Sequence, residues 1–317
     1  MNQPAIDEAD EARDRAVGRA LVVAAALMWS TAGMFAKAPH LAGWPGPSLA
    51  FWRAVFASAV LLPLVRQPRW SWKMAPMVVC FVAMNYTFLT AMTKTEAANA
   101  IWLQNTAPIW VFLVSVFLFR EPLHPRDIPM AICGAIGVGV ILAFETRNAN
   151  LEGIVYGLLA AFTYAGVVLS LRRLREYQSS WLIALNHLAT AVVLAPLVYA
   201  DFQESGGATG WPHGVQWPLL AGFGILQMGL PYVLFARGLK RIPGHEASGI
   251  VLLEPTLTPL WVFLAWSWAP GYESPRWWTL VGGGLILLGL AFRYVGANAA
   301  PKDATTAADE PQRQVDD

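Results

Sequence analysis

The sequence predicts an all-α integral membrane protein with ten transmembrane helices, arranged as two inverted five-helix repeats. Of the 317 residues, 56% are hydrophobic and only 14% are charged, whereas soluble domains are usually about 25% charged. Apolar runs of about 20 residues, long enough to cross a bilayer, recur along the whole chain. Basic residues alternate between the two sides of these runs, and the two halves of the chain resemble each other.

Ten candidate spans follow one another along the chain. They cover about residues 19–38, 47–65, 75–93, 97–119, 126–144, 152–171, 179–199, 215–236, 246–268 and 275–297. Segments rich in Pro and Gly, at 39–47 and 204–214, separate several of them. A soluble helical bundle is disfavoured, because the spans are long and uniformly apolar and lack a polar face. We expect a cytoplasmic N-terminal segment at 1–18 and a disordered cytoplasmic tail at 298–317.

The distribution of Lys and Arg predicts the orientation. Short cytoplasmic loops carry an excess of these residues. Of the 22 Lys and Arg residues, 17 fall on one side of the ten spans and 4 on the other, while Arg53 lies within a span. Both termini are therefore expected in the cytoplasm, with the chain in the cell inner membrane. The N-terminus lacks the apolar core and cleavage site of a secretory signal, so the first span is expected to be retained.

An internal repeat relates the two halves, with a first repeat expected at 19–144 and a second at 152–297. The stretch "GRALVVAAALMWSTAG" from Gly18 corresponds to "GIVYGLLAAFTYAG" from Gly153. Because each half has an odd number of spans, the second half enters the membrane upside down relative to the first. Inverted repeats of this kind are typical of secondary transporters, whose binding sites lie near the midplane between the repeats.

The alignment of the fourth span with the ninth has two solutions. Pro108 begins "PIWVFL" and Pro259 begins "PLWVFL", which favours pairing these two prolines. Laying "AMTKT" at 91–95 on "GLKRI" at 238–242 instead pairs Pro108 with Pro255. The sequence leaves both registers open.

Several motifs, taken in order, resemble those of a known family. They are "AAALMWSTAGMFAK", "TAP" followed by "FLFREPL", "AAFTYAGVVLSLRRL", "GLKRIPGHEASGIVLLEPTLTP" and the Gly-rich fifth and tenth spans. Over residues 18–297 the chain resembles EamA-type permeases of the drug/metabolite transporter superfamily. The resemblance implies ten helices, a central cavity open alternately to each side, and export or exchange of small solutes such as amino acids. It does not specify the substrate.

The chain departs from the family pattern at one place. The fourth span ends in Arg120-Glu121, the usual acidic stop, but the second half has Trp-Ser-Trp at 266–268 with Glu273 displaced. We assign Glu273 no shared role.

Ionisable residues within a span are functional candidates, because burying a charge at the bilayer centre costs at least ~2.5 kcal/mol. Glu254 lies near the midplane of the ninth span, directly before Pro255. It is a candidate proton acceptor or a contact for a substrate amine, or else a neutral acid that bonds neighbouring helices. Arg53 could bind a substrate carboxylate, snorkel outward or tie helices together. Their depths differ by roughly 9 Å, which argues against a direct ion pair.

Other polar and aromatic residues within the spans form a second group of candidates for substrate binding. They are Asn85, Tyr86, Trp102, Gln104, Asn105, Tyr164, His187, Gln227 and Tyr232. Each has an alternative structural role, since amides and histidines often bond helices to one another. Trp29 is a further aromatic at a helix centre. Tryptophans at span ends, including Trp44, Trp70, Trp72, Trp211, Trp217, Trp277 and Trp278, are expected to be interfacial anchors.

The function predicted from these features is secondary transport of a small metabolite, with amino acids or related polar or amphipathic solutes as the expected cargo. An intramembrane enzyme and a receptor or scaffold are the alternatives, but the spans contain no clustered catalytic groups and neither alternative accounts for the inverted repeat. We expect no catalytic residues, metal, cofactor or nucleic-acid partner. Protons are a candidate coupling ion through Glu254, and the protein is expected to act as a monomer in the bilayer.

Overall fold

The structure, a computed structural model, describes residues 3–120, 125, 127–145, 151–270, 272 and 274–294. Within these ranges the regular elements are all helices. Nine helical segments of the described chain are long and apolar enough to cross a membrane, and a shorter apolar helix, Trp277–Arg293, makes the tenth. The expected all-α, ten-helix fold is confirmed.

The first half of the chain forms spans one to five. These are α1 (Gln3–Trp29) with α2 (Ala32–Ala36), α3 (Gly46–Leu61), α4 (Ala75–Lys94), α5 (Ala97–Gln104) with α6 (Ala107–Phe117), and α7 (Asp127–Glu145). Short helical turns η1 (Pro39–Leu41), η2 (Leu62–Leu64) and η3 (Trp72–Met74) flank them. Because α1 begins at Gln3, most of the segment expected at 1–18 is helical.

The second half forms spans six to ten. These are α8 (Leu151–Arg173), α9 (Ser179–Glu204), α10 (Gln216–Gly224) with η5 (Ile225–Gly229) and α11 (Leu230–Gly238), α12 (Gly244–Val251) with α13 (Leu253–Trp266), and α14 (Trp277–Tyr294). The tail at 298–317, Glu121 and Glu273 lie outside the described residues.

Prolines explain why the fourth and ninth spans are interrupted. A proline ring clashes with the carbonyl four residues before it. Helix α5 ends at Gln104, four residues before Pro108, and α12 ends at Val251, four residues before Pro255. Pro259 lies inside α13 without breaking it. The two helix breaks therefore pair Pro108 with Pro255, which resolves the register that the sequence left open.

Two further spans are interrupted for different reasons. Between α1 and α2, the hydroxyls of Ser30 and Thr31 donate to the carbonyls of Leu27 and Met28, at 2.7 and 2.6 Å. Such side-chain bonds compete with the backbone hydrogen bonds of the helix for the same carbonyl groups. The segment η5 is a π-helix, and it precedes Pro231, whose ring displaces the carbonyl of the residue four before it.

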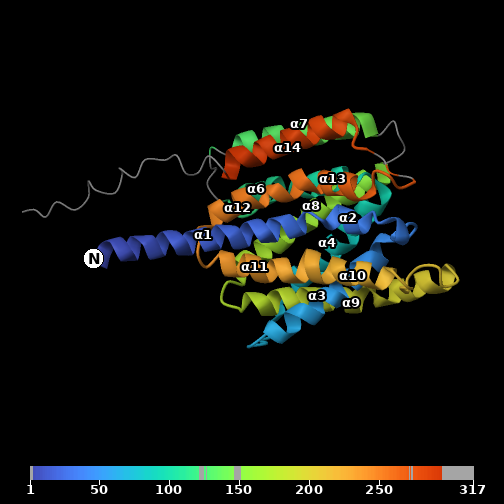
Figure 1. Ribbon diagram of the computed structural model, residues 1–317. Coiled ribbons are helices and arrows are strands. Elements are labelled where there is room, and N and C mark those ends of the chain that lie inside the picture. Colours follow the sequence, from blue (N-terminus) through green and yellow to red (C-terminus); the bar gives the residue numbers. More distant parts are fainter. Residues whose placement is uncertain are drawn as a thin grey trace, which may run out of the picture.

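The packing of the spans has the symmetry expected of two inverted repeats. Helix α1 packs on α11, α8 on α4, α3 on α9, and α7 on α14, while α5 contacts α13. The first span packs on the eighth, and its counterpart in the second half, the sixth span, packs on the third. The other three contacts each join a span to its own counterpart in the other half. Figure 1 shows α7 and α14 side by side at one edge of the bundle. The repeat limits 19–144 and 152–297 stay a prediction.

Glycines bring α7 and α14 into close contact. A Cβ atom at Gly137 would lie 2.4 Å from the carbonyl oxygen of Gly282, and one at Gly282 would lie 2.6 Å from that of Gly137. Both distances are below any real contact of a Cβ atom, so no larger residue fits without movement. Small residues at such crossings allow helix backbones to approach and pack in lipid.

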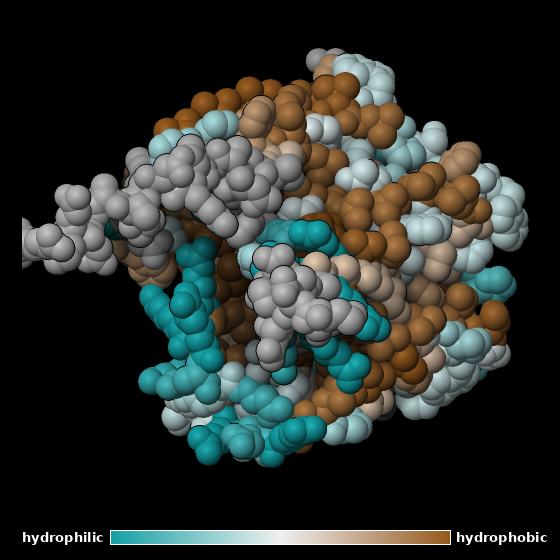
Figure 2. All heavy atoms as spheres, turned by 60° about the vertical axis from the view of Figure 1, so that its left-hand side comes forward, coloured by the Kyte–Doolittle hydropathy of each residue, from teal (hydrophilic) through white to brown (hydrophobic). Residues whose placement is uncertain are grey.

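Ion pairs lie at both ends of the bundle, while Lys and Arg are more numerous at one of them. We call one the basic end, where Arg241 pairs with Asp14 at 2.8 Å, Arg293 pairs with Asp127 at 2.6 Å, and Arg19 pairs with Glu246. At the opposite end, Lys94 pairs with Glu152 at 2.9 Å and Arg276 with Glu96 at 3.7 Å. Figure 2 shows hydrophilic residues gathered at one end and hydrophobic surface along the flank.

Most of the tryptophans at span ends face outward, as interfacial anchors should. Trp70, Trp72, Trp211 and Trp277 are each at least half exposed, with Trp72 at 81%. Trp44 is an exception, because only 3% of it is exposed. It packs in the interior at the opposite end, so the expectation that it is an interfacial anchor was wrong.

Candidate functional site

Helices from both halves bring several polar residues together inside the bundle. We call this group the central cluster: Arg53 of α3, Asn85 of α4, His187 of α9, Gln227 of η5, Tyr232 of α11 and Glu254 of α13. All six are candidates from the sequence. Arg53, Asn85, His187 and Gln227 are at most 2% exposed, so they face neither lipid nor bulk water.

Arg53 is the cation of the central cluster. Its guanidinium donates a hydrogen bond to the Asn85 Oδ1 atom. The rings of Phe223 and Phe88 flank it, with centroids 5.2 and 5.8 Å from its Cζ. Its Nε atom is buried with no hydrogen-bond partner among the described residues. Arg53 thus ties α3 to α4 and keeps a donor available for a ligand.

Glu254 lies within electrostatic reach of Arg53 without forming an ion pair. Its carboxyl group interacts electrostatically with both Arg53 and Tyr232. No hydrogen bond or ion pair of this carboxyl group occurs in the described part of the chain. The carboxyl group and the guanidinium therefore lie within Coulombic range of each other, and no direct contact between them occurs in the described chain.

His187 lies beside this charged pair. Its ring meets Phe81 at 5.0 Å and Tyr232 at 6.1 Å, both edge to face. Both of its ring nitrogens are buried and lack a partner among the described residues. A buried polar atom without a partner costs about 1–3 kcal/mol, so the described residues alone leave the polar atoms of this ring unsatisfied.

The π-helical segment carries Gln227 into the cluster. Its Nε2 atom donates to the backbone carbonyl of Trp29 at 3.2 Å, while its Oε1 atom is buried and has no partner in the described ranges. The Trp29 ring lies edge to face with Tyr232, at 5.2 Å. π-Helical turns are often found at functional sites, because the extra residue redirects side chains.

The remaining candidates lie outside the central cluster. Trp102 donates from Nε1 to the carbonyl of Pro255 at 2.8 Å and joins the fourth span to the ninth. Gln104 is the last residue of α5 and is buried. The Asn105 amide donates to the carbonyl of Ile101 at 2.8 Å, so it satisfies a backbone acceptor near the end of α5.

A cavity of about 830 Å³ opens near the opposite end of the bundle. Tyr86 and Tyr156 lie on its wall with ring centroids 6.1 Å apart, and Lys37, Lys94 and Glu96 also line it. Tyr86, a candidate from the sequence, therefore belongs to this cavity, although it follows Asn85 of the central cluster in α4. Trp44, Trp266 and Tyr272 add aromatic surface. Burial and the charge of Glu96 raise the pKa of Tyr272, which keeps its phenol neutral.

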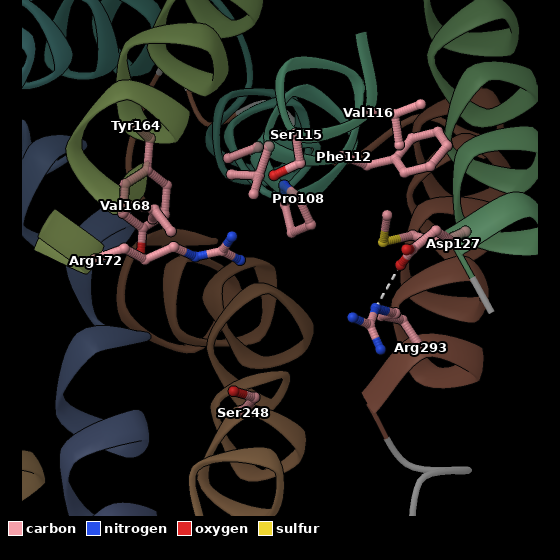
Figure 3. Close-up of a pocket in the computed structure, with 13 residues that line it drawn as sticks. Pro108, Phe112, Ser115, Val116, Asp127, Tyr164, Val168, Arg172, Ser248 and Arg293 are labelled. Atoms are coloured by element: carbon pink, nitrogen blue, oxygen red, sulfur yellow. Dashed lines mark ion pairs between the residues drawn. The ribbon is translucent and has the colours of Figure 1, made fainter. Parts of the chain in front are cut away.

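A second cavity, of about 320 Å³, lies at the basic end (Figure 3). Tyr164, Arg172 and Arg293 line it, together with Ser115 and Asp127. Tyr164 therefore belongs to this cavity and not to the central cluster. Sequence reasoning counted Arg172 and Arg293 only as orientation signals. Neither cavity is lined by Arg53, His187 or Glu254, so the cluster lies apart from both.

The fold, the symmetric pairing of the spans and the enclosed polar cluster define a membrane transporter. The sequence matches the EamA-like transporter family over residues 16–143 and again over 151–295. The chain therefore belongs to this family, as the sequence motifs predicted.

Relatives include named exporters. An uncharacterized transporter of Archaeoglobus fulgidus is 26% identical over 86% of this chain and 94% of its own length. The pseudopaline exporter CntI of Pseudomonas aeruginosa is 26% identical over 77% of this chain and 84% of its own. The aromatic amino acid exporter YddG of Ancylobacter novellus is 25% identical over 75% of this chain and 80% of its own length.

A solved crystal structure has the same fold. It superposes with a TM-score of 0.63 and covers 90% of this chain and 100% of its own. Its sequence is 22% identical, so this likeness supports the architecture alone.

Proposed function

We propose that this protein exports a small zwitterionic solute, an amino acid or a related metabolite, by alternating access through the central cluster. One observation carries the proposal. Arg53 is a basic group and Glu254 an acidic one; they lie within electrostatic reach of each other and form no ion pair in the described chain. A zwitterion matches both, because its carboxylate suits the planar guanidinium and its ammonium group suits the carboxyl group.

The surroundings of the two charged groups support an amphipathic cargo. Phe88 and Phe223 flank the guanidinium, and Trp29 and Tyr232 pack together beside His187. Binding sites for small molecules usually combine such apolar walls with a few polar groups that fix orientation. The names of two relatives, exporters of pseudopaline and of aromatic amino acids, agree with an exported metabolite. Glu254 is also our candidate for proton coupling.

The proposal includes the orientation. The basic end faces the cytoplasm, since Lys and Arg favour that side, and the chain resides in the inner membrane with both termini inside. The cavity of about 830 Å³ then faces outward, where an exporter releases its cargo.

Transport into proteoliposomes tests the proposal. The purified chain is reconstituted with pooled radiolabelled amino acids, and counterflow is compared for the parent, Arg53→Gln, Arg53→Lys and Glu254→Gln. Loss of one charge-assisted contact should lower flux about tenfold or more. Arg53→Lys keeps the charge but not the planar fork, so it should be intermediate. Leu253→Ala, next to Glu254 but 37% exposed, should transport normally.

Substrate analogues separate the two contacts. An N-acetyl amino acid lacks the ammonium group, so its flux should not change in Glu254→Gln. An amino acid methyl ester lacks the carboxylate, so its flux should not change in Arg53→Gln. Parental flux of the free amino acid by both variants would refute the proposal. Chemical conversion of the cargo would favour an enzyme, and absence of flux for every pool would favour a scaffold.

A further inference from the structure

The cavity at the basic end has an arginine that nothing in the described chain engages. Arg172, near the end of α8, makes no hydrogen bond or ion pair with the described residues. Figure 3 shows its guanidinium directed across the cavity, towards Pro108 and Ser115 of α6. A ligand in the cavity would therefore meet the donors of this guanidinium.

Two other groups face the same space. Ser115 has a buried hydroxyl group with no partner among the described residues. Arg293 of α14 is held by Asp127 of α7 through Nε at 2.6 Å. Its side chain is 33% exposed. Ser248 of α12 also lines the wall. Arg172, Ser115 and Arg293 come from three different helices, and their donors face one cavity.

The charge of the cavity favours a single anion. Arg172 and Arg293 contribute two positive charges and Asp127 one negative charge among the lining residues, which leaves a net charge of +1. The wall also has an apolar part, which includes Val111 and Phe112 of α6 and Val168 of α8. A ligand that suits both parts has one oxyanion group and an apolar portion.

We propose that this cavity is a binding site for the oxyanion group of an amphipathic ligand, held by Arg172 and Arg293 with Ser115 as a further donor. The oxyanion is either the carboxylate of a soluble metabolite or the phosphate of an anionic lipid headgroup. Both present the acceptor oxygens that arginine binds with its planar fork. The site is separate from Arg53 and Glu254, so the inference does not depend on the proposed export.

Adjacent arginines provide a matched pair of variants. Arg172 lines the cavity, while its neighbour Arg173 stacks on the ring of Phe119 at 4.7 Å and does not line it. Both are exposed residues at the same end of α8. Arg172→Gln and Arg173→Gln therefore remove the same charge from the same region, and only the first removes a donor from the cavity.

Binding is measured on the purified full chain in two arms. In the first, titration calorimetry uses N-acetyl-leucine, a carboxylate without an ammonium group, in an Arg53→Gln background that removes the central cation. In the second, native mass spectrometry counts phosphatidylglycerol retained against phosphatidylcholine. We expect Arg172→Gln to weaken binding about tenfold or more in at least one arm. We expect Arg173→Gln to change binding less than about twofold.

The two arms identify the source of the oxyanion. A loss confined to N-acetyl-leucine assigns the site to a soluble carboxylate, and a loss confined to phosphatidylglycerol assigns it to a lipid headgroup. Equal effects of the two arginine variants, or no effect of Arg172→Gln in either arm, overturn the inference. Because no transport is measured, failure here leaves the proposed export untouched, and failed export leaves this site untouched.

Discussion

The indole Nε1 atom of Trp102 donates to the backbone carbonyl of Pro255 at 2.8 Å. This bond joins the interrupted fourth span to the interrupted ninth, next to Glu254. The back of the Trp102 ring rests on α14, where a Cβ atom at Gly283 would lie 1.9 Å from it. Trp102 thus sets the position of α13, and with it the position of Glu254, by filling the space between three spans.

Replacing Gly283 with alanine should therefore destabilise the protein. The added methyl group forces the buried Trp102 ring to move, and overpacking of this kind typically costs about 1–3 kcal/mol. Gly284→Ala is the matched control, because nothing lies within 4 Å of a Cβ atom there and alanine is the better helix former. Thermal unfolding in detergent should show a lower midpoint for Gly283→Ala only. Equal midpoints for the two variants would contradict the packing described.

His187→Leu should lower transport without lowering stability. Both ring nitrogens are buried without partners in the described chain, so their removal relieves a penalty and an apolar side chain can fill the space. Counterflow measures the loss of transport, and thermal unfolding of the same preparations measures the stability. Leu188→Ala, an exposed neighbour on α9, serves as control. A midpoint several degrees lower for His187→Leu would show that the histidine is structural.

Asp127→Asn should strengthen anion binding at the basic end. The substitution frees Arg293 and raises the charge of the cavity lining from +1 to +2, which should increase the affinity for N-acetyl-leucine or phosphatidylglycerol by a few-fold. The cost to stability should be at most about 1 kcal/mol, since the ion pair is partly exposed. The calorimetric and mass-spectrometric measurements described for Arg172 apply here. Weaker binding would mean that Asp127 positions Arg293 for the ligand.

Tags at the two termini should be accessible from the same face of the membrane. Ten spans return the chain to the side where it began, and the excess of Lys and Arg assigns that side to the cytoplasm. Fusions of alkaline phosphatase and green fluorescent protein to either end report the location. We expect fluorescence without phosphatase activity at both ends, and phosphatase activity in a fusion within 204–214. Termini on opposite faces would refute the span count.

The spans could be predicted from the sequence because their cause is local, and two of the helix breaks found in the structure also have a local cause. Length and apolarity define a span in lipid, and Pro108 and Pro255 act on carbonyls four residues away. Sequence reasoning also selected all six members of the central cluster, since polar side chains are rare within apolar runs. It could not separate them from Trp102 and Asn105, which donate to backbone carbonyls, or from Gln104, which is buried at the end of α5.

The sequence by itself determined a ten-span, internally repeated membrane protein and a list of candidates that contains all six members of the central cluster. Only the tertiary structure decided which of those residues meet, which proline pairs with Pro108, and that Tyr164, Arg172 and Arg293 share a separate cavity. The physical reason is that hydropathy and helix breaking act along one segment of the chain. The distances between side chains on different spans depend instead on how closely the helices pack, through contacts such as Gly137 with Gly282.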